Sequence, residues 1–329
     1  MTVTIGLVGI GNIGLVIAQN LIGAGHRVVG YRRTMMEKFI AIGGEAGTSP
    51  QDVAEKADVL LTSLPSREAL HEVFCGPEGI LSANRKGLDV FELSTISLKA
   101  KLSVRDVARS SNVILLDCTI SGNPVYISAR NATIFVGGDR KVFDRWVLLL
   151  RDITDKVTWM GQFGTGRVAK FVALYLVAAH TLVAAEAFEL ATRAGLDRTA
   201  MFEAIKGSNA TSAMLESRGA LMVNRDYKGY DTNKRRESKA TQTSSQIPSR
   251  GMDNRVRQIN RLVRLASLLG GKYPLMEAMN SAYDDAVKAQ IGVYDIAEVF
   301  EFLMANKEES VDFSEVLALL DQMESVIDP

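Results

Sequence analysis

The chain has 329 residues, which is long enough for about two domains, each with a substantial core. Its 38 Lys and Arg residues balance its 38 Asp and Glu residues, so the net charge gives no argument for nucleic-acid binding. Two cysteines, Cys75 and Cys118, supply neither a disulfide framework nor the spacing of a metal site. Met1 leads almost directly into a strand-like segment, so we expect no signal peptide, a cytoplasmic location and no membrane partner.

A glycine motif follows the first strand-like segment. Residues 3–8 (VTIGLV) are mostly apolar or β-branched without alternation, which is typical of a strand buried on both faces. The pattern G-x-G-x-x-G comes next, formed by Gly9, Ile10, Gly11, Asn12, Ile13 and Gly14. In a dinucleotide site the first glycine permits the tight turn, the second admits the pyrophosphate and the third allows close helix–strand packing. Because a helical pattern follows, we favour a dinucleotide site over a glycine-rich turn without a ligand.

The end of the second strand, 27–31, favours NADP over NAD. An NAD-selective site places an acidic residue here to bind the ribose 2′-hydroxyl, and no acidic residue occurs between Gly14 and Glu37. The strand is followed instead by Arg32, Arg33 and Thr34. Two guanidinium groups and a hydroxyl suit a 2′-phosphate, and the alternative is a pair of solvated surface arginines.

Further strands and helices alternate up to about residue 160. The predicted strands are 58–63, 88–93, 113–117, 133–138 and 157–159, with a helix over 139–150. Ligands of open α/β sheets bind beyond the carboxyl ends of strands. Three of these ends carry hydroxyls or a loop-shaping proline, in Leu64-Pro65-Ser66, Ser94-Thr95 and Cys118–Gly122. We therefore predict an α/β fold, in which a Rossmann-type doubly wound sheet of residues 1–160 binds NADP.

A long apolar helix is predicted over 161–193, between the two domains. From Phe171 to Ala185 only His180 and Thr181 are clearly polar, and the run is shorter than the roughly 20 residues of a membrane span. We expect this helix to be buried on nearly all sides. Lys170 lies at its start, and partial desolvation beside an apolar wall favours the neutral amine that proton transfer needs. A snorkelling lysine is the alternative.

The second half of the chain predicts an all-α domain over 194–310. Helices are predicted at 197–206, 213–222, 255–269, 274–289 and 296–305. A polar, basic loop over 223–254 interrupts them, and an acidic helix with an apolar stripe is predicted over 311–329. The two charged segments are either separate solvated faces or partners of each other. The apolar long helix and the all-helical domain suggest packing between subunits.

These motifs together resemble the β-hydroxyacid dehydrogenase family, which includes 3-hydroxyisobutyrate dehydrogenases and tartronate-semialdehyde reductases and is related to 6-phosphogluconate dehydrogenase. The matching segments are Gly9–Gly14, Arg33-Thr34, Leu64-Pro65, Ser94-Thr95, Asp117–Asn123 and Gly161–Lys170. The resemblance implies that Lys170 is the catalytic acid/base and that Leu64, Pro65 and Thr95 line the cofactor. It further implies that Ser121, Gly122 and Asn123 hold the substrate carboxylate or hydroxyl, and that the chain forms a homodimer or homotetramer.

The chain departs from the family pattern near the substrate. The family has an asparagine pair three and four residues after the lysine, where this chain has Ala173 and Leu174. A leucine one turn from Lys170 cannot hydrogen-bond a substrate hydroxyl. A Lys-Asp pair of the family falls on Arg257-Gln258, where Arg257 keeps the positive charge and is grouped with the cofactor-binding residues. The cofactor site is therefore expected to be intact and the substrate site, which includes position 174, to be altered.

Three functions follow from this comparison. The first is an NADP-dependent oxidoreductase that acts on a small β-hydroxy acid or its semialdehyde, with a carboxylate-bearing small molecule as substrate and no metal. The second is a reductase of imines or of less polar carbonyl compounds, which Leu174 motivates. The third is a catalytically weak NADP-binding scaffold protein, which the altered substrate site and the basic loop motivate.

Overall fold

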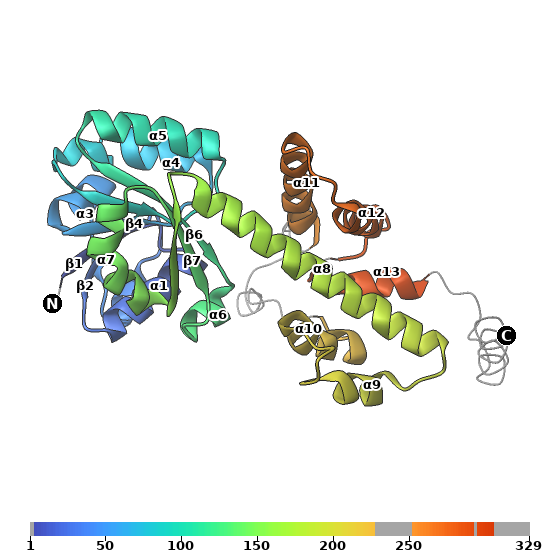
Figure 1. The fold of residues 1–329 in the computed structure, drawn as a ribbon. Coiled ribbons are helices and arrows are strands. Elements are labelled where there is room, and N and C mark those ends of the chain that lie inside the picture. The colour runs from blue at the N-terminus through green and yellow to red at the C-terminus, as the bar shows by residue number, and fades with distance from the viewer. Residues whose placement is uncertain (1–2, 228–251, 293–294, 306–329) are drawn as a thin grey trace. The chain divides into compact units, whose positions relative to one another are not determined.

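The computed structural model describes residues 3–227, 252–292 and 295–305. The chain divides into two compact units, Met1–Lys170 and Phe171–Pro329. Figure 1 shows both units and labels their elements where there is room. The predicted boundaries at residues 160, 193 and 310 stay predictions, and the predicted acidic helix over 311–329 lies outside the described residues together with most of the predicted basic loop.

Within residues 3–227, the first unit is built on an eight-stranded sheet with the order β3-β2-β1-β4-β5-β6-β7-β8. The strands are β1 (Thr4–Val8), β2 (Arg27–Tyr31), β3 (Glu45–Ala46), β4 (Val59–Thr62), β5 (Asp89–Glu92), β6 (Ile114–Ser121), β7 (Thr133–Gly137) and β8 (Lys156–Gly161). All neighbouring strands are parallel except β6 and β7. This strand order confirms the predicted Rossmann-type sheet.

Helices cover both faces of this sheet (Figure 1). They are α1 (Asn12–Gly23), α2 (Glu37–Ala41), α3 (Pro50–Lys56), α4 (Arg67–Cys75), η1 (Ile80–Ala83), α5 (Leu98–Ser110), α6 (Pro124–Ser128) and α7 (Arg140–Ile153). Leu61 and Phe91 belong to the core formed with α1 and α7, whereas their neighbours Leu60 and Val90 belong to the core formed with α3, α4 and α5. Both faces of β4 and β5 are therefore buried, which explains why these segments do not alternate between apolar and polar residues in the sequence.

Strand β6 is longer than the sequence predicts. The prediction ended it at residue 117, but it continues to Ser121. The extension pairs antiparallel with β7, with Asp117 opposite Gly137 and Ser121 opposite Thr133. The predicted loop Cys118–Ser121 is therefore strand, and only Gly122 and Asn123 remain in the turn before α6.

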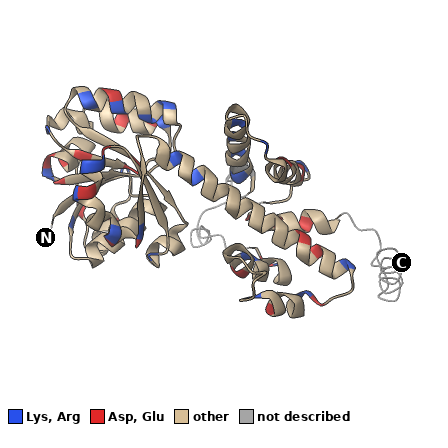
Figure 2. Ribbon diagram, in the orientation of Figure 1, with Lys and Arg blue, Asp and Glu red and all other residues tan. Residues whose placement is uncertain are grey.

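The sequence predicted that the long helix would be buried on nearly all sides. This prediction is wrong for α8 (Thr165–Arg193), which has an exposed face. Val172, Leu176 and Val183 are 54%, 49% and 50% exposed, and His180 is exposed as well. No charged residue interrupts the middle of the helix (Figure 2). Among the described residues α8 passes a length-and-composition test for a membrane span, a test that the core helix of a soluble protein also passes. The opposite face of α8 contributes to the core of the second unit.

The second unit is helical throughout its described residues after α8. Its elements are α9 (Arg198–Ile205), α10 (Ala213–Asn224), α11 (Met252–Leu268), α12 (Pro274–Lys288), η4 (Ile296–Glu298) and α13 (Val299–Ala305). The Tyr283 hydroxyl on α12 donates to the carbonyl oxygen of Ala178 on α8 at 3.0 Å. Arg225, in the predicted basic segment, pairs with Glu301 on α13. The helical second half is therefore confirmed, whereas most of the predicted basic loop and all of the predicted acidic helix lie outside the described residues.

Candidate active site

The glycine loop between β1 and α1 has the shape of a phosphate-binding turn. Gly9 has a φ of +100°, and a Cβ atom there would lie 2.2 Å from the carbonyl oxygen of Ser63. A Cβ on Gly14 would lie 2.3 Å from the carbonyl oxygen of Gly9, so packing within the loop requires both glycines. A Cβ on Gly11 would meet no atom within 4 Å. Because Gly11 is the N-cap of α1, this open space lies at the positive end of a helix and fits a pyrophosphate.

The arginines after β2 lie on the same side of the sheet as the glycine loop. The Arg32 guanidinium donates a 3.1 Å hydrogen bond to the carbonyl oxygen of Ile10, which joins β2 to the loop. Arg33 and Thr34 are exposed, and Arg33 Nη1 lies 3.8 Å from Glu72 Oε2 on α4. The other predicted loop residues begin α1, where Asn12 is exposed and Ile13 is partly buried. Cationic groups therefore lie at the end of β2, where the ribose of a dinucleotide binds.

Lys170 lies at the carboxyl ends of β5 and β6. Its Nζ donates to Thr95 Oγ1 at 2.7 Å and to the carbonyl oxygen of Ile120 at 2.9 Å. The neighbouring loop after β4 is tied to the same place, because the amide of Leu64 donates to Ser94 Oγ at 2.6 Å. Pro65 follows in this loop and is exposed. The structure thus brings the predicted catalytic lysine to two of the three strand ends that the sequence singled out.

The predicted substrate motif forms the turn between β6 and α6. Ser121 is the last residue of β6 and is partly buried. Gly122 has a φ of +152°, and a Cβ there would lie 2.8 Å from Ala132 Cβ. Asn123 caps α6, since its Oδ1 accepts from the amide of Tyr126 at 3.0 Å. The carboxamide oxygen of Asn123 is therefore engaged by the chain itself.

A buried ionic triad lies beneath these strand ends and was not foreseen from the sequence. The Nζ of Lys101 on α5 lies 2.5 Å from Glu92 Oε2 and 2.7 Å from Asp117 Oδ1, and all three side chains are fully buried. Burial by itself lowers the pKa of Lys101, but the charges of Glu92 and Asp117 outweigh it, so the pKa of Lys101 lies above its ordinary value. The sequence signal was a lysine at an apolar helix position, in register with the buried Val104 and Ala108.

Two predicted site residues belong to the second unit. Leu174 follows Lys170 on α8 and is buried, and Arg257 lies exposed on α11. Their predicted roles stay predictions, because the local geometry of the first unit does not involve them.

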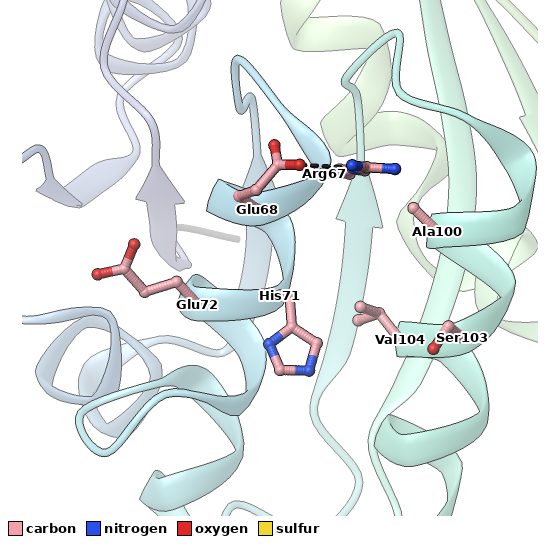
Figure 3. Close-up of a pocket in the computed structure, with 7 residues that line it drawn as sticks. All are labelled: Arg67, Glu68, His71, Glu72, Ala100, Ser103 and Val104. Atoms are coloured by element: carbon pink, nitrogen blue, oxygen red, sulfur yellow. Dashed lines mark hydrogen bonds and ion pairs between the residues drawn. The ribbon is translucent and has the colours of Figure 1, made fainter.

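A surface groove with a volume of about 440 Å³ lies between α4 and α5. Figure 3 shows the His71 ring between the two helices, facing Ser103 and Val104, with Arg67 and Glu68 paired to each other. No residue predicted for the site lines this groove, so it is distinct from the strand-end site. Among the described residues there is also no cluster of His, Cys, Asp and Glu that could hold a metal ion.

Comparison with known proteins identifies the family. Residues 4–161 match a model of the NAD-binding domain of 6-phosphogluconate dehydrogenase, and residues 164–231 match a model described as the NAD-binding region of NADP-dependent 3-hydroxyisobutyrate dehydrogenase. The chain is 30% identical over 221 residues to 2-(hydroxymethyl)glutarate dehydrogenase of Eubacterium barkeri, covering 66% of this chain and 73% of that protein. The chain belongs to the β-hydroxyacid dehydrogenase family.

Other members of the β-hydroxyacid dehydrogenase family match over different spans. The probable mitochondrial 3-hydroxyisobutyrate dehydrogenase of Dictyostelium discoideum is 31% identical over 196 residues, a match covering 59% of this chain and 61% of that protein. This match spans less than two thirds of that relative. The crystal structure of 3-hydroxyisobutyrate dehydrogenase from Salmonella typhimurium superimposes with a TM-score of 0.73 at 23% identity, covering 91% of this chain and 99% of that one. The superposition shows a shared fold, and the predicted family resemblance is confirmed.

Proposed function

We propose that this chain is an NADP-dependent oxidoreductase that transfers a hydride between NADPH and a small β-hydroxy acid or its semialdehyde. The observation that carries the proposal is the position of Lys170, whose Nζ is held by Thr95 and Ile120 at the ends of β5 and β6. The relatives' names support the substrate class. 3-Hydroxyisobutyrate and 2-(hydroxymethyl)glutarate both carry a hydroxymethyl group on the carbon next to a carboxylate.

The residues of the first unit fit an NADP cofactor. The open space at Gly11 suits the pyrophosphate, and Arg32, Arg33 and Thr34 provide positive charge and a hydroxyl for a 2′-phosphate. No acidic residue between Gly14 and Glu37 is present to bind a free 2′-hydroxyl. When bound, the cofactor supplies or accepts the hydride, and the protein has to provide the remaining chemistry.

The chain itself provides proton transfer and orientation. During reduction, the Lys170 ammonium stabilises the negative charge that develops on the carbonyl oxygen and donates the proton to it. During oxidation, the neutral Lys170 amine removes the hydroxyl proton. The Thr95 hydroxyl and the Ile120 carbonyl fix the direction of the amine. Ser121 and the backbone amides around Gly122 anchor the substrate carboxylate.

We also infer that the chain forms a homodimer or a homotetramer. The support is the exposed apolar stripe of α8, which we define as Val172, Leu176, Val183 and Leu190. These residues lie on one face of a single helix, and an apolar stripe of this length is characteristic of a helix that packs against another protein surface.

A cofactor titration followed by a substrate panel tests the proposed function. NADPH is expected to bind more tightly than NADH, and the panel contains 3-hydroxyisobutyrate, 2-(hydroxymethyl)glutarate, tartronate semialdehyde and a cyclic imine. Lys170→Met is expected to lower kcat roughly 10²- to 10⁴-fold while NADPH still binds. Lys99→Met is the control, because Lys99 is exposed on α5. Unchanged turnover in Lys170→Met would remove the lysine from the mechanism.

The buried Leu174 motivates one alternative function. A leucine instead of asparagine one turn after the lysine favours a less polar substrate, such as an imine or a bulky aldehyde. Reduction of the imine without activity on any hydroxy acid would support this alternative. Tight NADPH binding without turnover of any panel member would instead support a scaffold role, and Leu174→Asn would then show whether an asparagine restores activity.

A further inference from the structure

We propose that Lys101 is a positioning residue for Lys170, acting through the buried triad of Lys101, Glu92 and Asp117. This inference rests on the proposed function only for its effect on turnover. The triad belongs to the first unit and connects α5 with β5 and β6. Its lysine is fully buried, which is unfavourable without partners and is compensated here by two carboxylates within 2.5 and 2.7 Å of its Nζ.

The first carboxylate supports the loop that carries Thr95. Glu92 Oε1 accepts a 2.9 Å hydrogen bond from the amide of Ser94. Ser94 Oγ in turn accepts a hydrogen bond from the amide of Leu64 at 2.6 Å, and Thr95 is the residue that receives the Lys170 ammonium. The carboxylate of Glu92 therefore holds the backbone next to Thr95, whose hydroxyl accepts the hydrogen bond from Lys170.

The second carboxylate supports the helix that carries Lys170. Asp117 Oδ2 accepts a 3.1 Å hydrogen bond from the amide of Arg167, in the first turn of α8. The Arg167 guanidinium also donates to the carbonyl oxygen of Ile96, next to Thr95. Arg167 and Lys170 are three residues apart and share one side of the helix. Asp117 therefore fixes the starting position of the catalytic side chain.

Lys101 forms an ion pair with each of the two carboxylates. It sets the separation of Glu92 and Asp117, and through them the separation of Thr95 from the first turn of α8. A displacement of about 1 Å between reacting groups can cost on the order of 100-fold in rate. A fully buried lysine could thus affect turnover without touching substrate or cofactor.

The ionisable groups around Lys101 predict how a neutral replacement behaves. Glu92 faces it from β5 and Asp117 from β6, while the backbone amide of Arg167 on α8 donates to the other oxygen of Asp117. The buried Cys118 thiol has a pKa raised by burial and by the charge of Asp117, so it stays neutral. In Lys101→Met two close carboxylates lose their cation, and one of them takes up a proton. That carboxyl has a raised pKa in the folded state, so the variant is most stable at acid pH and loses stability as the pH rises through the raised value.

The test compares Lys101→Met with Lys99→Met, which changes an exposed lysine two residues earlier on the same helix. Trace acetylation with acetic anhydride, measured by mass spectrometry, gives the reactivity of Lys170 relative to Lys38, an exposed lysine that is distant from Lys170 and Lys101 in the sequence. We expect Lys101→Met to change this ratio at least about threefold and to lower kcat roughly 10- to 100-fold, with Kd for NADPH changed less than about twofold. Its kcat should also fall as the pH rises through the titration of the new carboxyl, whereas that of Lys99→Met should not.

Glu92→Gln provides the second variant in case Lys101→Met does not fold. The amide can accept from Ser94 or face the ammonium with its oxygen, but it cannot do both, so a smaller change of the same sign is expected in the Lys170 ratio. Wild-type labelling ratio, kcat and pH profile in the folded variants would overturn the positioning role. If the wild-type protein turned over no substrate, the proposed function would fail, whereas the labelling ratio would still decide whether Lys101 positions Lys170.

Discussion

Lys170 Nζ donates a 2.7 Å hydrogen bond to the hydroxyl of Thr95, a residue 75 positions earlier in the chain. The bond joins the second turn of α8 to the loop after β5 and is reinforced by the bond from Nζ to the carbonyl oxygen of Ile120. One side of the ammonium is therefore held by the protein. The amine is presented at the carboxyl edge of the sheet, where ligands of this fold bind.

Replacing Thr95 by valine tests how the orientation of Lys170 affects turnover, because the lysine itself stays in place. Valine keeps the shape of threonine and removes the acceptor, and a hydrogen bond to a charged group contributes about 1.5–3 kcal/mol. We therefore expect Thr95→Val to lower kcat roughly 10- to 100-fold. Thr95 is exposed, so the free energy of unfolding should change little. Thr95→Ser retains the hydroxyl and should keep most of the activity, and equal losses in both variants would contradict the role of this bond.

The glycine loop offers a matched pair of substitutions that separates folding from cofactor binding. In Gly14→Ala the new Cβ would lie 2.3 Å from the carbonyl oxygen of Gly9, so the loop must shift and the midpoint of thermal unfolding should fall by several degrees. In Gly11→Ala the new Cβ meets no atom within 4 Å, so stability should change by less than about 1 kcal/mol. NADPH affinity should nevertheless fall about tenfold or more, because the methyl group enters the space of the pyrophosphate. Thermal melts and a fluorescence titration measure the two effects, and undiminished NADPH affinity in Gly11→Ala would contradict the cofactor site.

Much of the sheet was predictable because several of its strands, such as β4 and β5, are buried on both faces. Such strands appear in the sequence as short apolar runs, and β1, β2, β4 and β5 lie where those runs occur. The end of β6 was not predictable in the same way. Residues 118–121 contain hydroxyls that favour a turn, and only the antiparallel pairing with β7 makes them strand. Long-range pairing overrides local preference here.

The candidate site shows the same limit at individual side chains. The glycine spacing identified the loop, because backbone conformation and close packing restrict those positions to glycine. Lys101 was missed, because a lysine within a helical pattern suggests a solvated side chain, and its two partners are contributed by separate strands. The exposed face of α8 was missed too, since an apolar helix has the same composition whether the chain itself or another chain covers it.

Glu72 should weaken NADPH binding slightly through Arg33. The two side chains are 3.8 Å apart and both are largely exposed, so the ion pair competes with a 2′-phosphate for the guanidinium only weakly. We expect Glu72→Gln to lower Kd for NADPH about twofold at low salt, with no change for NADH, and the difference should disappear at about 1 M salt. Arg33→Gln should raise Kd for NADPH about tenfold or more. Equal effects of Arg33→Gln on NADPH and NADH would show that Arg33 does not bind the phosphate.

If the apolar stripe of α8 forms the subunit interface, a charged side chain introduced there should dissociate the proposed oligomer. Leu176 is 49% exposed in one chain, and lysine is a good helix former, so Leu176→Lys should leave the fold of each subunit intact. Burial of a leucine contributes about 1.5–3 kcal/mol, and a two-fold interface carries the substitution twice. The dimer Kd should therefore rise at least about 100-fold, as measured by sedimentation velocity over a concentration series. Leu148→Lys is the control, because Leu148 is 71% exposed on α7 and lies outside the stripe. If Leu148→Lys dissociated the oligomer and Leu176→Lys did not, the subunits would pack through the first unit rather than through the stripe of α8.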